Sequence, residues 1–475
     1  MKWLLAASAV VIATLITVVL AIEHANVTPR RLAVYIAHRV SGHRPAIEHA
    51  GDVAARLLLL LDRGQREWIY PVLLTPSRSS DPVPRTPNRA RVALVGSTSE
   101  ALNAIARSVP GDAITFLPGT YRFKGSYIEA SRAGTVDSPI TVRAAVPGSV
   151  TLEFDMVEGF LVSAPYWQFE DLRIRGICAD DSNCEHAFHV VGNGTHFAAR
   201  RNVVTDFNAH FKINGIRGAY PDNGVIEDNF LSNSRVRATG NPVTPIDLVA
   251  ASHWVVQGNR ISDFAKGESD RISYGAFFKG GGEDNRFERN VVICEERLRG
   301  APGQRVGLSL GGGGTAPSAC RDGTRCITEQ NGSVIASNLI ASCSDDGIYL
   351  NRAAMSMITH NTLIDTGGIT ARFAETSADI EGNLIDGVIR ASSAAVVHMK
   401  DNFASRLTAI YLGLHRVRDL FVDAGMLDLR WRKGPVKRPT GTSAPADLCA
   451  LKRSVPPAYG AFDNIVSCIT AASER

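Results

Sequence analysis

One short unit recurs along the middle of the chain: a few residues in which apolar and polar side chains alternate, then an asparagine, then two or three mostly apolar residues. It reads HWVVQGNRI around Asn259 and NRFERNVVI around Asn290. Alternation with a period of two residues is typical of strands that bury one face. The same unit surrounds six further asparagines: Asn202, Asn229, Asn338, Asn361, Asn383 and Asn402.

The spacing of these asparagines predicts a solenoid. They follow one another at intervals of 19 to 48 residues, and the shortest intervals approach about 22 residues, the length of one coil of three short strands. A single coil cannot bury its inner face, so successive coils stack over one elongated core. Asparagine before an aliphatic residue is also common in other Asn-rich β proteins, but its repeated occurrence after strand-like alternation favours coils.

We therefore predict an all-β fold, a right-handed single-stranded parallel β-helix over residues 92 to 405 with roughly ten or more coils. Side chains that repeat once per coil must stack, and stacked asparagine amides can bond to one another. The length of 475 residues requires no division of such a solenoid into domains. We expect one ladder along a single bend, formed by Asn229, Asn259, Asn290, Asn338, Asn361 and Asn383.

Residues 1 to 21, MKWLLAASAVVIATLITVVLA, contain one lysine followed by an apolar run. The run approaches the roughly 20 residues that span a bilayer, which favours an uncleaved N-terminal membrane anchor. Val19 and Ala21 also fit the small-residue rule for cleavage of a signal peptide. Both alternatives predict export, to the periplasmic side of the inner membrane if the run is an anchor, or as a secreted protein if it is cleaved.

Residues 22 to 91 lack the coil pattern. Residues 46 to 61 have helical length and a broad apolar face, and Gly64 fits a stop. This helix is expected either to lie on the membrane surface or to cap the first coil. The stretch TPSRSSDPVPRTPNR then predicts a linker, and residues 406 to 475 are expected to close the solenoid.

Eight cysteines fall into couples. Cys294 and Cys343 follow consecutive ladder asparagines, which places them on neighbouring coils. An even count together with an export signal predicts disulfides in an oxidising compartment. With no C-x-x-C pair and no histidine pair at ligand spacing, we expect no metal and no cofactor. The remaining couples are Cys178 with Cys184, Cys320 with Cys326, and Cys449 with Cys468.

The formal net charge of +4 is small for this length, and no stripe of Lys and Arg is interleaved with aromatic residues. Nucleic acid is therefore not an expected partner. Long insertions and an N-terminal anchor suit a monomer that carries a site better than they suit a structural fibre or adhesin.

The first coils carry a more specific pattern, in which ALNAIARSVPGDAITFLPGTYRF precedes SPITV. This pattern resembles the N-terminal coils of the chondroitinase B and alginate lyase family of polysaccharide lyases. The stretches DLFVDAGMLDLRW and PAYGAFDN also resemble the closing segment of β-helical proteins, so the resemblance covers residues 92 to 465. The matching positions in the first coils are Ala101, Leu102, Pro110, Gly111, Asp112, Ile114, Pro118, Gly119, Thr120, Tyr121, Ser138, Pro139, Ile140, Thr141 and Val142.

The resemblance implies a β-helical enzyme that cleaves a uronate by β-elimination. A base removes the proton next to the carboxylate, a cation or neutral donor stabilises the enediolate, and an acid assists the leaving oxygen. In the resembled enzymes two glutamates of an E-x-E strand hold Ca²⁺, a lysine is the base and an arginine is the acid. Here His210 and Lys212 stand at the glutamate positions, and Val249 and Ala250 stand where Arg-His is expected. A Ca²⁺-dependent lyase of the usual kind is therefore not predicted.

A cationic set on consecutive coils takes the place of those residues. Neighbouring coils lie about 4.8 Å apart, so these side chains form one patch if they point outward on the same face. Loops 234–244 and 264–273 would wall the patch. The alternative is that the set consists of solvated charges on the outside of the tube. We predict Lys279, Arg217, Lys212 and His210 as catalytic residues, and Asp247, His253, Arg271 and Glu283 as substrate-binding residues.

Two adjacent carboxyls, Asp345 and Asp346 in SCSDDGIYLNR, form a separate candidate. Paired aspartates on a β-helix strand resemble the polygalacturonase type of hydrolase, in which carboxylates supply the acid and the base. The further Asp, His and Arg-x-Lys elements of that type do not stand at matching coils, and Asp-Gly before an apolar strand is most simply a turn.

The predicted function is therefore that of a cell-envelope polysaccharide-processing protein, a metal-independent lyase or a related enzyme acting on an acidic, uronate-containing glycan. Its partners would be that polysaccharide and, through the N-terminal anchor, the membrane. The alternative is a non-catalytic glycan-binding β-helix that kept the scaffold and lost the chemistry.

Overall fold

The computed structural model describes residues 17, 22–24, 26–64, 91–312, 314–323, 325–439 and 444–468. Most of the apolar run 1–21 and the Pro-rich stretch 65–90 lie outside the described residues, and so do the predictions of an anchor, a signal peptide and a linker. Among the residues that are described, no helix is both long and apolar enough to cross a membrane.

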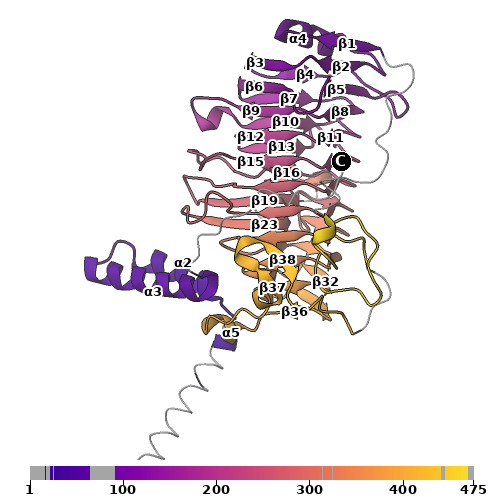
Figure 1. Cartoon of the computed structure of the whole chain (residues 1–475). Coiled ribbons are helices and arrows are strands. Elements are labelled where there is room, and N and C mark those ends of the chain that lie inside the picture. Colours follow the sequence, from indigo (N-terminus) through magenta and orange to yellow (C-terminus); the bar gives the residue numbers. More distant parts are fainter. Residues whose placement is uncertain are drawn as a thin grey trace, which may run out of the picture.

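The strands wind into three long sheets whose neighbouring strands pair in parallel (Figure 1). Each complete coil gives one strand in turn to a twelve-stranded, an eleven-stranded and a ten-stranded sheet, counted over the described chain. The three strands of one coil belong to three different sheets and do not pair with one another. Every backbone ladder in these sheets therefore joins one coil to the next. The predicted parallel β-helix is confirmed.

The strands have the following bounds. The twelve-stranded sheet contains β1 (Val92–Val95), β2 (Ala113–Phe116), β5 (Ile140–Ala144), β8 (Trp167–Glu170), β11 (Ala198–Arg200), β14 (Val225–Glu227), β17 (Val255–Gln257), β21 (Arg286–Glu288), β25 (Val334–Ala336), β29 (Ser356–Thr359), β32 (Ser377–Glu381) and β35 (Val396–Lys400). The eleven-stranded sheet contains β3 (Gly119–Gly125), β6 (Val150–Met156), β9 (Arg173–Gly176), β12 (Val203–Thr205), β15 (Phe230–Ser232), β18 (Arg260–Ser262), β22 (Val291–Ile293), β26 (Leu339–Ala341), β30 (Thr362–Ile364), β33 (Leu384–Ile385) and β36 (Phe403–Ala404). The ten-stranded sheet contains β4 (Ile128–Ala130), β7 (Glu158–Val162), β10 (His186–Val191), β13 (Ala209–Asn214), β16 (Ile246–Val249), β19 (Ile272–Lys279), β23 (Gln304–Leu310), β27 (Ile348–Asn351), β31 (Gly368–Arg372) and β34 (Val388–Ser392). A short ribbon contains β20 (Gly282–Glu283), β24 (Gln330–Asn331) and β28 (Ala353–Ala354).

A ladder of asparagines runs along the bend between the twelve-stranded and eleven-stranded sheets. Nδ2 of Asn229 donates to Oδ1 of Asn259 at 3.0 Å, and Nδ2 of Asn259 donates to Oδ1 of Asn290 at 3.0 Å. The backbone N–H of Asn229 donates to the same Asn259 oxygen at 2.9 Å. These bonds continue in both directions, from Asn202 to Asn402. The predicted ladder is confirmed, and it fixes the register from coil to coil.

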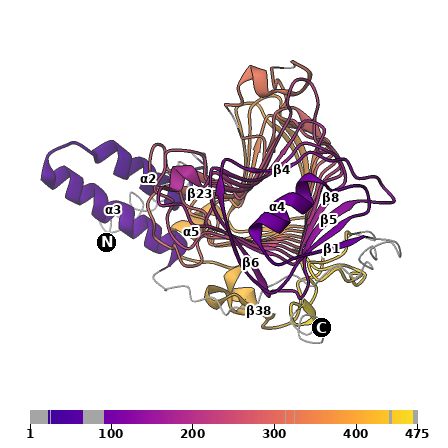
Figure 2. The same ribbon diagram turned by 90° about the horizontal axis from the view of Figure 1, so that it is seen from above.

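A short helix closes the first coil. α4 (Thr98–Ala106) lies across the end of the β-helix in Figure 2 and buries Ala101 and Ile105 in the core. The Ser97 hydroxyl accepts the N–H of Glu100 at 3.2 Å, and the Glu100 carboxylate accepts the N–H of Gly96 at 2.7 Å. These reciprocal bonds are a variant of the capping box, and they start the helix directly after β1.

Two helices that precede the solenoid in sequence form a hairpin beside its later coils, α2 (Pro29–Val40) and α3 (Pro45–Arg63) (Figure 1). α3 is the helix expected near residues 46 to 61. The expectation that it might cap the first coil is wrong, because α3 ends among the later coils, where Arg63 pairs with Glu295 and Asp365 at 3.1 Å each.

The C-terminal segment covers the outer face of the eleven-stranded sheet along its later strands, from β22 onward. It contains α5 (Leu407–Tyr411) and an antiparallel pair, β37 (Phe421–Asp423) with β38 (Asp428–Trp431). Its apolar side chains, including Phe421 and Phe462, join one buried cluster with outward side chains of the sheet such as Leu339. The later part of this face is therefore covered by the chain itself.

Four disulfides are present, and they are the predicted pairs. Cys294 and Cys343 follow the paired strands β22 and β26 and join neighbouring coils. Disulfides indicate an oxidising compartment, as for an extracellular or periplasmic protein. The other pairs are Cys178 with Cys184, Cys320 with Cys326, and Cys449 with Cys468.

Candidate functional site

Outward side chains of the ten-stranded sheet align in columns, because parallel strands keep their register from coil to coil. Lys212 of β13 pairs in register with Asp247 of β16, and Asp247 pairs with Phe277 of β19. Nζ of Lys212 lies 2.8 Å from Oδ2 of Asp247, and the two side chains are 22% and 8% exposed. Two of the residues predicted from the sequence thus meet as a partly buried ion pair.

Lys279 ends β19 and stands in the next column of this face. Its Nζ lies 4.4 Å from the centroid of the Phe277 ring, a cation–π distance. A Cβ on Gly312 would lie 3.1 Å from Lys279 Cδ, so the glycine leaves room for the lysine stem. Burial lowers the pKa of Lys279; Asp247 opposes that shift and Lys212 adds to it. The Lys279 amine therefore loses its proton more easily than a solvated lysine does.

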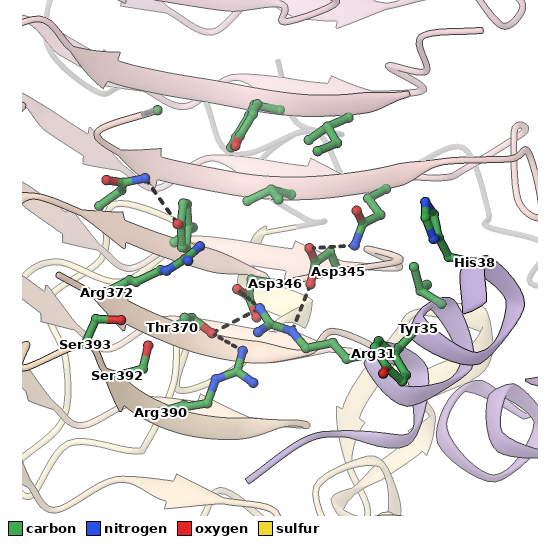
Figure 3. Close-up of a pocket in the computed structure, with 18 of the residues that line it drawn as sticks. Arg31, Tyr35, His38, Asp345, Asp346, Thr370, Arg372, Arg390, Ser392 and Ser393 are labelled. Atoms are coloured by element: carbon green, nitrogen blue, oxygen red, sulfur yellow. Dashed lines mark hydrogen bonds and ion pairs between the residues drawn. The ribbon is translucent and has the colours of Figure 1, made fainter. Parts of the chain in front are cut away.

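A cavity of about 940 Å³ extends from Gly312 to the face of α2 (Figure 3). One wall comes from the strands β19 to β34 of the ten-stranded sheet, and the other comes from α2. Its volume lies in the range of sites that hold small ligands. Since Gly312 also lies beside Lys279, the cavity and the Lys212–Lys279 patch adjoin each other, and the two together are called here the strip.

The floor of the cavity offers phenol, amide and guanidinium groups. Nδ2 of Asn351 donates to the hydroxyl of Tyr349 at 3.1 Å. Asn351 of β27 is in register with Arg372 of β31, whose guanidinium lies 4.6 Å from the Phe373 ring centroid. Burial raises the pKa of Tyr274, on the first strand of the cavity, so its phenol stays protonated. The floor therefore combines proton donors with a cation.

The edge of the cavity next to α2 carries two carboxyls. Nε of Arg31 donates to Asp345 at 3.2 Å, and its NH2 group contacts Asp346. Nε2 of Gln304 donates to the other oxygen of Asp345 at 3.2 Å. Burial raises the pKa of Asp346 above its ordinary range; Arg31 opposes this shift and Asp345 adds to it.

α2 is also bonded to the cavity floor. The Thr370 hydroxyl accepts Arg31 at 3.3 Å and Arg390 at 3.0 Å, as the dashed lines in Figure 3 show. The guanidinium of Arg390 donates in addition to the carbonyl of Asn26, just before α2, at 3.2 Å. The helix is therefore a fixed wall of the cavity.

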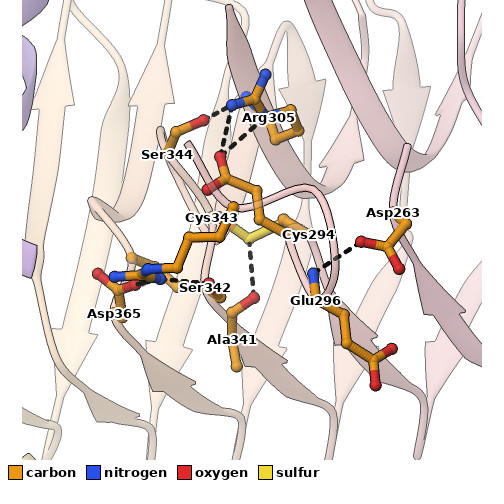
Figure 4. The surroundings of a disulfide bond; sticks show 12 residues. Asp263, Cys294, Glu296, Arg305, Ala341, Ser342, Cys343, Ser344 and Asp365 are labelled. Carbon is orange, nitrogen blue, oxygen red and sulfur yellow. Dashed lines mark hydrogen bonds and ion pairs between the residues drawn. A yellow bond between two sulfur atoms is a disulfide. The ribbon is translucent and has the colours of Figure 1, made fainter. Parts of the chain in front are cut away.

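Buried ion pairs behind the cavity fasten the hairpin to the solenoid. Asp365 lies beside the Cys294–Cys343 disulfide in Figure 4 and is completely buried. Burial disfavours its charged form, but the surrounding arginines outweigh burial and hold the pKa of Asp365 well below its ordinary range. Its closest partners are Arg299 at 2.7 Å, Arg30 at 3.1 Å and Arg63 at 3.1 Å.

His210 does not belong to the strip, and its predicted place on the outer surface is wrong. The side chain is fully buried because it packs against β15, where Nε2 bonds to the carbonyl of Ser232 at 3.1 Å. Burial lowers the pKa of His210 to about 4. A neutral, enclosed imidazole cannot contact a glycan on the surface.

The other four predicted residues lie around the strip and do not join it. Arg217 is exposed in a tight turn after β13, and Arg271 precedes β19, at the opposite end of that strand from Lys279. His253 and Glu283 are exposed at the corner between the ten-stranded and twelve-stranded sheets, where the N–H of His253 donates to the carbonyl of Glu283 at 3.0 Å.

The Ca²⁺ ion implied by the resemblance does not fit these residues. Ca²⁺ requires six to eight oxygen ligands, whereas the positions expected to supply carboxylates hold the buried imidazole of His210 and the cation of Lys212. No catalytic step here is assigned to Ca²⁺.

Different potential metal ligands lie on β7 and β10. The ligand atoms of Glu158, His186 and His189 all lie within 4.8 Å of one another. The interactions with His186 and His189 lower the pKa of Glu158 to about 2. The expectation of no histidine pair at ligand spacing is therefore wrong: the two imidazoles, three residues apart, meet on the outer face of one strand.

Sequence reasoning missed the floor and one wall of the cavity. Tyr349 and Asn351 alternate on one strand, and Arg372 is the register partner of Asn351 one coil later. Comparing the outward positions of successive coils would have found this column. Arg31 left no such signal, because 314 residues separate it from Asp345.

No protein-family model matches the chain, and no curated protein matches it. Among solved structures, it is similar to the pectate lyase Pel9A, at 16% identity and a TM-score of 0.49 over 76% of this chain and 90% of that chain. It is also similar to a rhamnogalacturonan lyase, at 14% identity and a TM-score of 0.47 over 66% and 87% of the two chains. A further similarity is to the PL6 family polysaccharide lyase Pedsa3628 from Pseudopedobacter saltans, at 15% identity and a TM-score of 0.37 over 66% and 93%. The strand pairing itself establishes the β-helix.

Proposed function

We propose that the protein is a cell-envelope polysaccharide-processing enzyme that acts on an acidic, uronate-containing glycan. The observation that supports this proposal best is the continuity of the strip, from the Lys212–Asp247 pair past Lys279 into a cavity that contains Arg372. Cations in a row suit the carboxylates of a uronate polymer. The ring of Phe277 suits the apolar face of a sugar.

The strip can fill the roles that β-elimination needs. Burial lowers the pKa of Lys279, so its neutral amine is the proposed base for the proton next to the carboxylate. Asn351, two coils from Lys279, is proposed to bind that carboxylate and stabilise the enediolate. Arg372, three coils from Lys279, is proposed to bind the carboxylate of a neighbouring sugar. The hydroxyl of Tyr349, bonded to Asn351 at 3.1 Å, is the proposed donor to the leaving oxygen. One C–H and one C–O bond break, and a C=C bond forms.

Lys212 and Asp247 have a different role in this proposal. Asp247 holds the Lys212 ammonium at 2.8 Å. Asp247 lies one coil from β19 and Lys212 lies two coils from it, so the pair is proposed to bind a neighbouring sugar of the same glycan. The envelope location rests on the four disulfides, which need an oxidising compartment. It also rests on the apolar run 1–21, as an anchor or a signal peptide.

Hydrolysis is a second candidate, favoured by one observation. Asp345 and Asp346 are adjacent carboxyls at the cavity edge, and burial raises the pKa of Asp346, as for a carboxyl that acts as an acid. Their shared contact with Arg31 disfavours this candidate, because the guanidinium occupies both carboxyls.

The test is incubation of the purified protein with polygalacturonate, alginate and chondroitin. Elimination gives an unsaturated product that absorbs ultraviolet light, hydrolysis gives reducing ends without that absorbance, and binding without either product identifies the non-catalytic alternative. The Lys279→Ala variant should lose about 10²–10⁴-fold in rate. Lys124→Ala, a lysine paired with Asp155 at 3.5 Å on the eleven-stranded sheet, should not change the rate.

The pH dependence gives a second readout. Since the base must be neutral, the rate should rise with pH and level off above the pKa of Lys279, which lies below that of an ordinary lysine. If none of the three polymers is bound or cleaved, or if Lys279→Ala cleaves like the wild type, the proposal is wrong.

A further inference from the structure

One group of side chains on the ten-stranded sheet has no place in the proposed elimination. Glu158 begins β7, and His186 begins β10, one coil later. Strand pairing registers Glu158 directly with His186. His189 follows on the same strand, with its ring centroid 4.9 Å from that of His186. All three side chains thus stand on strands of the sheet, which hold them in place more rigidly than loops do.

The distances suit a small cation. Nδ1 of His189 lies 2.8 Å from Oε1 of Glu158, and Nδ1 of His186 lies 3.7 Å from the same oxygen. Two ligand atoms bound tetrahedrally at about 2.0–2.2 Å from one ion are roughly 3.3–3.6 Å apart. The His186 contact is close to this spacing, and the shorter His189 contact is a hydrogen bond that a bound ion would replace. In the described part of the chain, this is the group of three His, Cys, Asp or Glu side chains that could surround an ion.

Hydrogen bonding leaves two imidazole nitrogens directed at the carboxylate. Nε2 of His189 lies 2.7 Å from the side-chain oxygen of Asn214. The tautomer that donates its Nε2 proton to Asn214 has an Nδ1 lone pair for a metal, in place of the hydrogen bond between Nδ1 and Glu158. Nδ1 of His186 is buried and has no hydrogen-bond partner among the described residues. A buried nitrogen without a partner is costly for the protein, and a bound cation would satisfy it.

We propose that Glu158, His186 and His189 bind a divalent first-row transition metal ion, with zinc as the best match. Two imidazole nitrogens and one carboxylate oxygen are ligands that zinc prefers, and three protein ligands leave a fourth position open. Asn214 orients His189 from outside the ligand set. The hard cations Ca²⁺ and Mg²⁺ prefer oxygen ligands only.

The position suggests what the open coordination site binds. His189 is in register with Lys212, and Lys212 pairs with Asp247, which offsets its charge near a metal ion. β10 precedes β19 by three coils, which corresponds to about 14 Å along the sheet. The ion would therefore lie too far from Lys279 for the reacting atoms. It would bind an oxygen ligand, a carboxylate or hydroxyl of a sugar farther along the strip. This last role rests on the proposed function, whereas the binding of the metal does not.

Metal binding to the purified full chain tests the inference without any glycan. After removal of metals with a chelator and dialysis, titration calorimetry with zinc chloride should show one ion per chain with a dissociation constant on the order of 1 µM or tighter. Calcium and magnesium chloride should show no binding at about 1 mM. Cobalt(II) should give the visible absorption of a site with nitrogen and oxygen ligands.

Variants identify the ligands. His186→Ala and His189→Ala should each weaken zinc binding by about 100-fold or more, and Asn214→Ala by about 10-fold. His253→Ala is the control, because His253 also lies near a carboxylate, Asp284 at 3.7 Å, on the exposed corner. Glu158→Gln keeps the shape of the side chain and serves if an alanine variant does not fold.

Two results would overturn the inference. One is the absence of zinc binding to the wild-type chain at about 100 µM. The other is binding that the histidine variants retain and His253→Ala loses. A chain that binds zinc but no acidic glycan would leave the metal site intact and remove the proposed function, so the two failures are distinguishable.

Discussion

The outer face of the ten-stranded sheet has two halves that differ in what covers them. In the first half, from β7 to β16, the pairs formed by Glu158 with His189 and by Lys212 with Asp247 lie within the sheet surface. In the second half, from β19 to β34, α2 lies over the strands and Arg31 reaches across to Asp345. The register and the strand type are the same in both halves. A helix from a distant part of the chain adds the second wall that turns this part of the sheet surface into an open-sided cavity.

The two halves should differ most in their response to loss of one carboxylate. Asp365→Ala leaves the buried Arg30, Arg63 and Arg299 without their shared partner, which should lower the free energy of unfolding by about 3–5 kcal/mol. The matched change in the open half, Asp247→Ala, should cost less than about 1 kcal/mol. Urea unfolding of both variants measures the difference, and equal midpoints would contradict it.

Acid should reveal the same asymmetry. Burial alone would raise the pKa values of Asp365 and Asp386. The arginines around Asp365 outweigh it and hold the pKa of that carboxyl below the ordinary range. Arg418 and His415 do the same for Asp386. A carboxyl whose pKa is lower in the folded state stabilises the fold above its unfolded pKa, about 3.9, and this stability is lost as pH falls further.

Urea midpoints measured from pH 7 to pH 2 should therefore fall steeply below about pH 4. In Asp365→Asn the fall should be shallower, because one of the two carboxyls no longer titrates. An Asp247→Asn control should follow the wild-type slope. An identical slope in all three proteins would show that Asp365 does not cause the acid sensitivity.

Loss of a ladder asparagine should have the same effect in both halves, because the ladder continues through the coils of both. Asn259→Ala and Asn361→Ala each remove the buried amide that bonds to the next coil, and each should cost about 1–3 kcal/mol. Thermal unfolding of the two variants should give similar shifts. A large cost at Asn361 and none at Asn259 would mean that the second half carries nearly all of the stability.

The smallest effect is expected for the ion pair on the open half. Lys212→Met removes the 2.8 Å contact with Asp247 but keeps most of the apolar stem, so stability should fall by about 1 kcal/mol because the buried carboxylate loses its partner. Cleavage or binding of an acidic glycan should weaken in the same variant. A protein that unfolds much more easily but binds glycan normally would assign Lys212 to the fold and not to the strip.

Patterns that repeat in every coil could be predicted from the sequence, and so could local cysteine pairs. Asn259 and Asn290 stand at equivalent bends because the coil imposes one environment on them. The patch expected on consecutive coils included Lys212 and Asp247, and these two side chains meet. The same expectation was wrong for His210, because coil position does not show that this side chain packs against β15. The sequence around Asp345 and Asp346 indicated a turn. It gave no sign of their partner Arg31, because Arg31 comes from the other end of the chain.

That long separation has a consequence for the order in which the molecule is made. Arg30 donates to the carbonyl of Cys343 and to Asp365, residues that lie 313 and 335 positions later. At the usual speed of translation, the hairpin waits on the order of tens of seconds before those coils leave the ribosome. Until then Arg30 can pair only with Asp62 of the same hairpin, and Arg63 lacks its carboxylate partners Glu295 and Asp365. Docking of the hairpin becomes a late step, and it reports that the chain has been completed at least as far as Asp365.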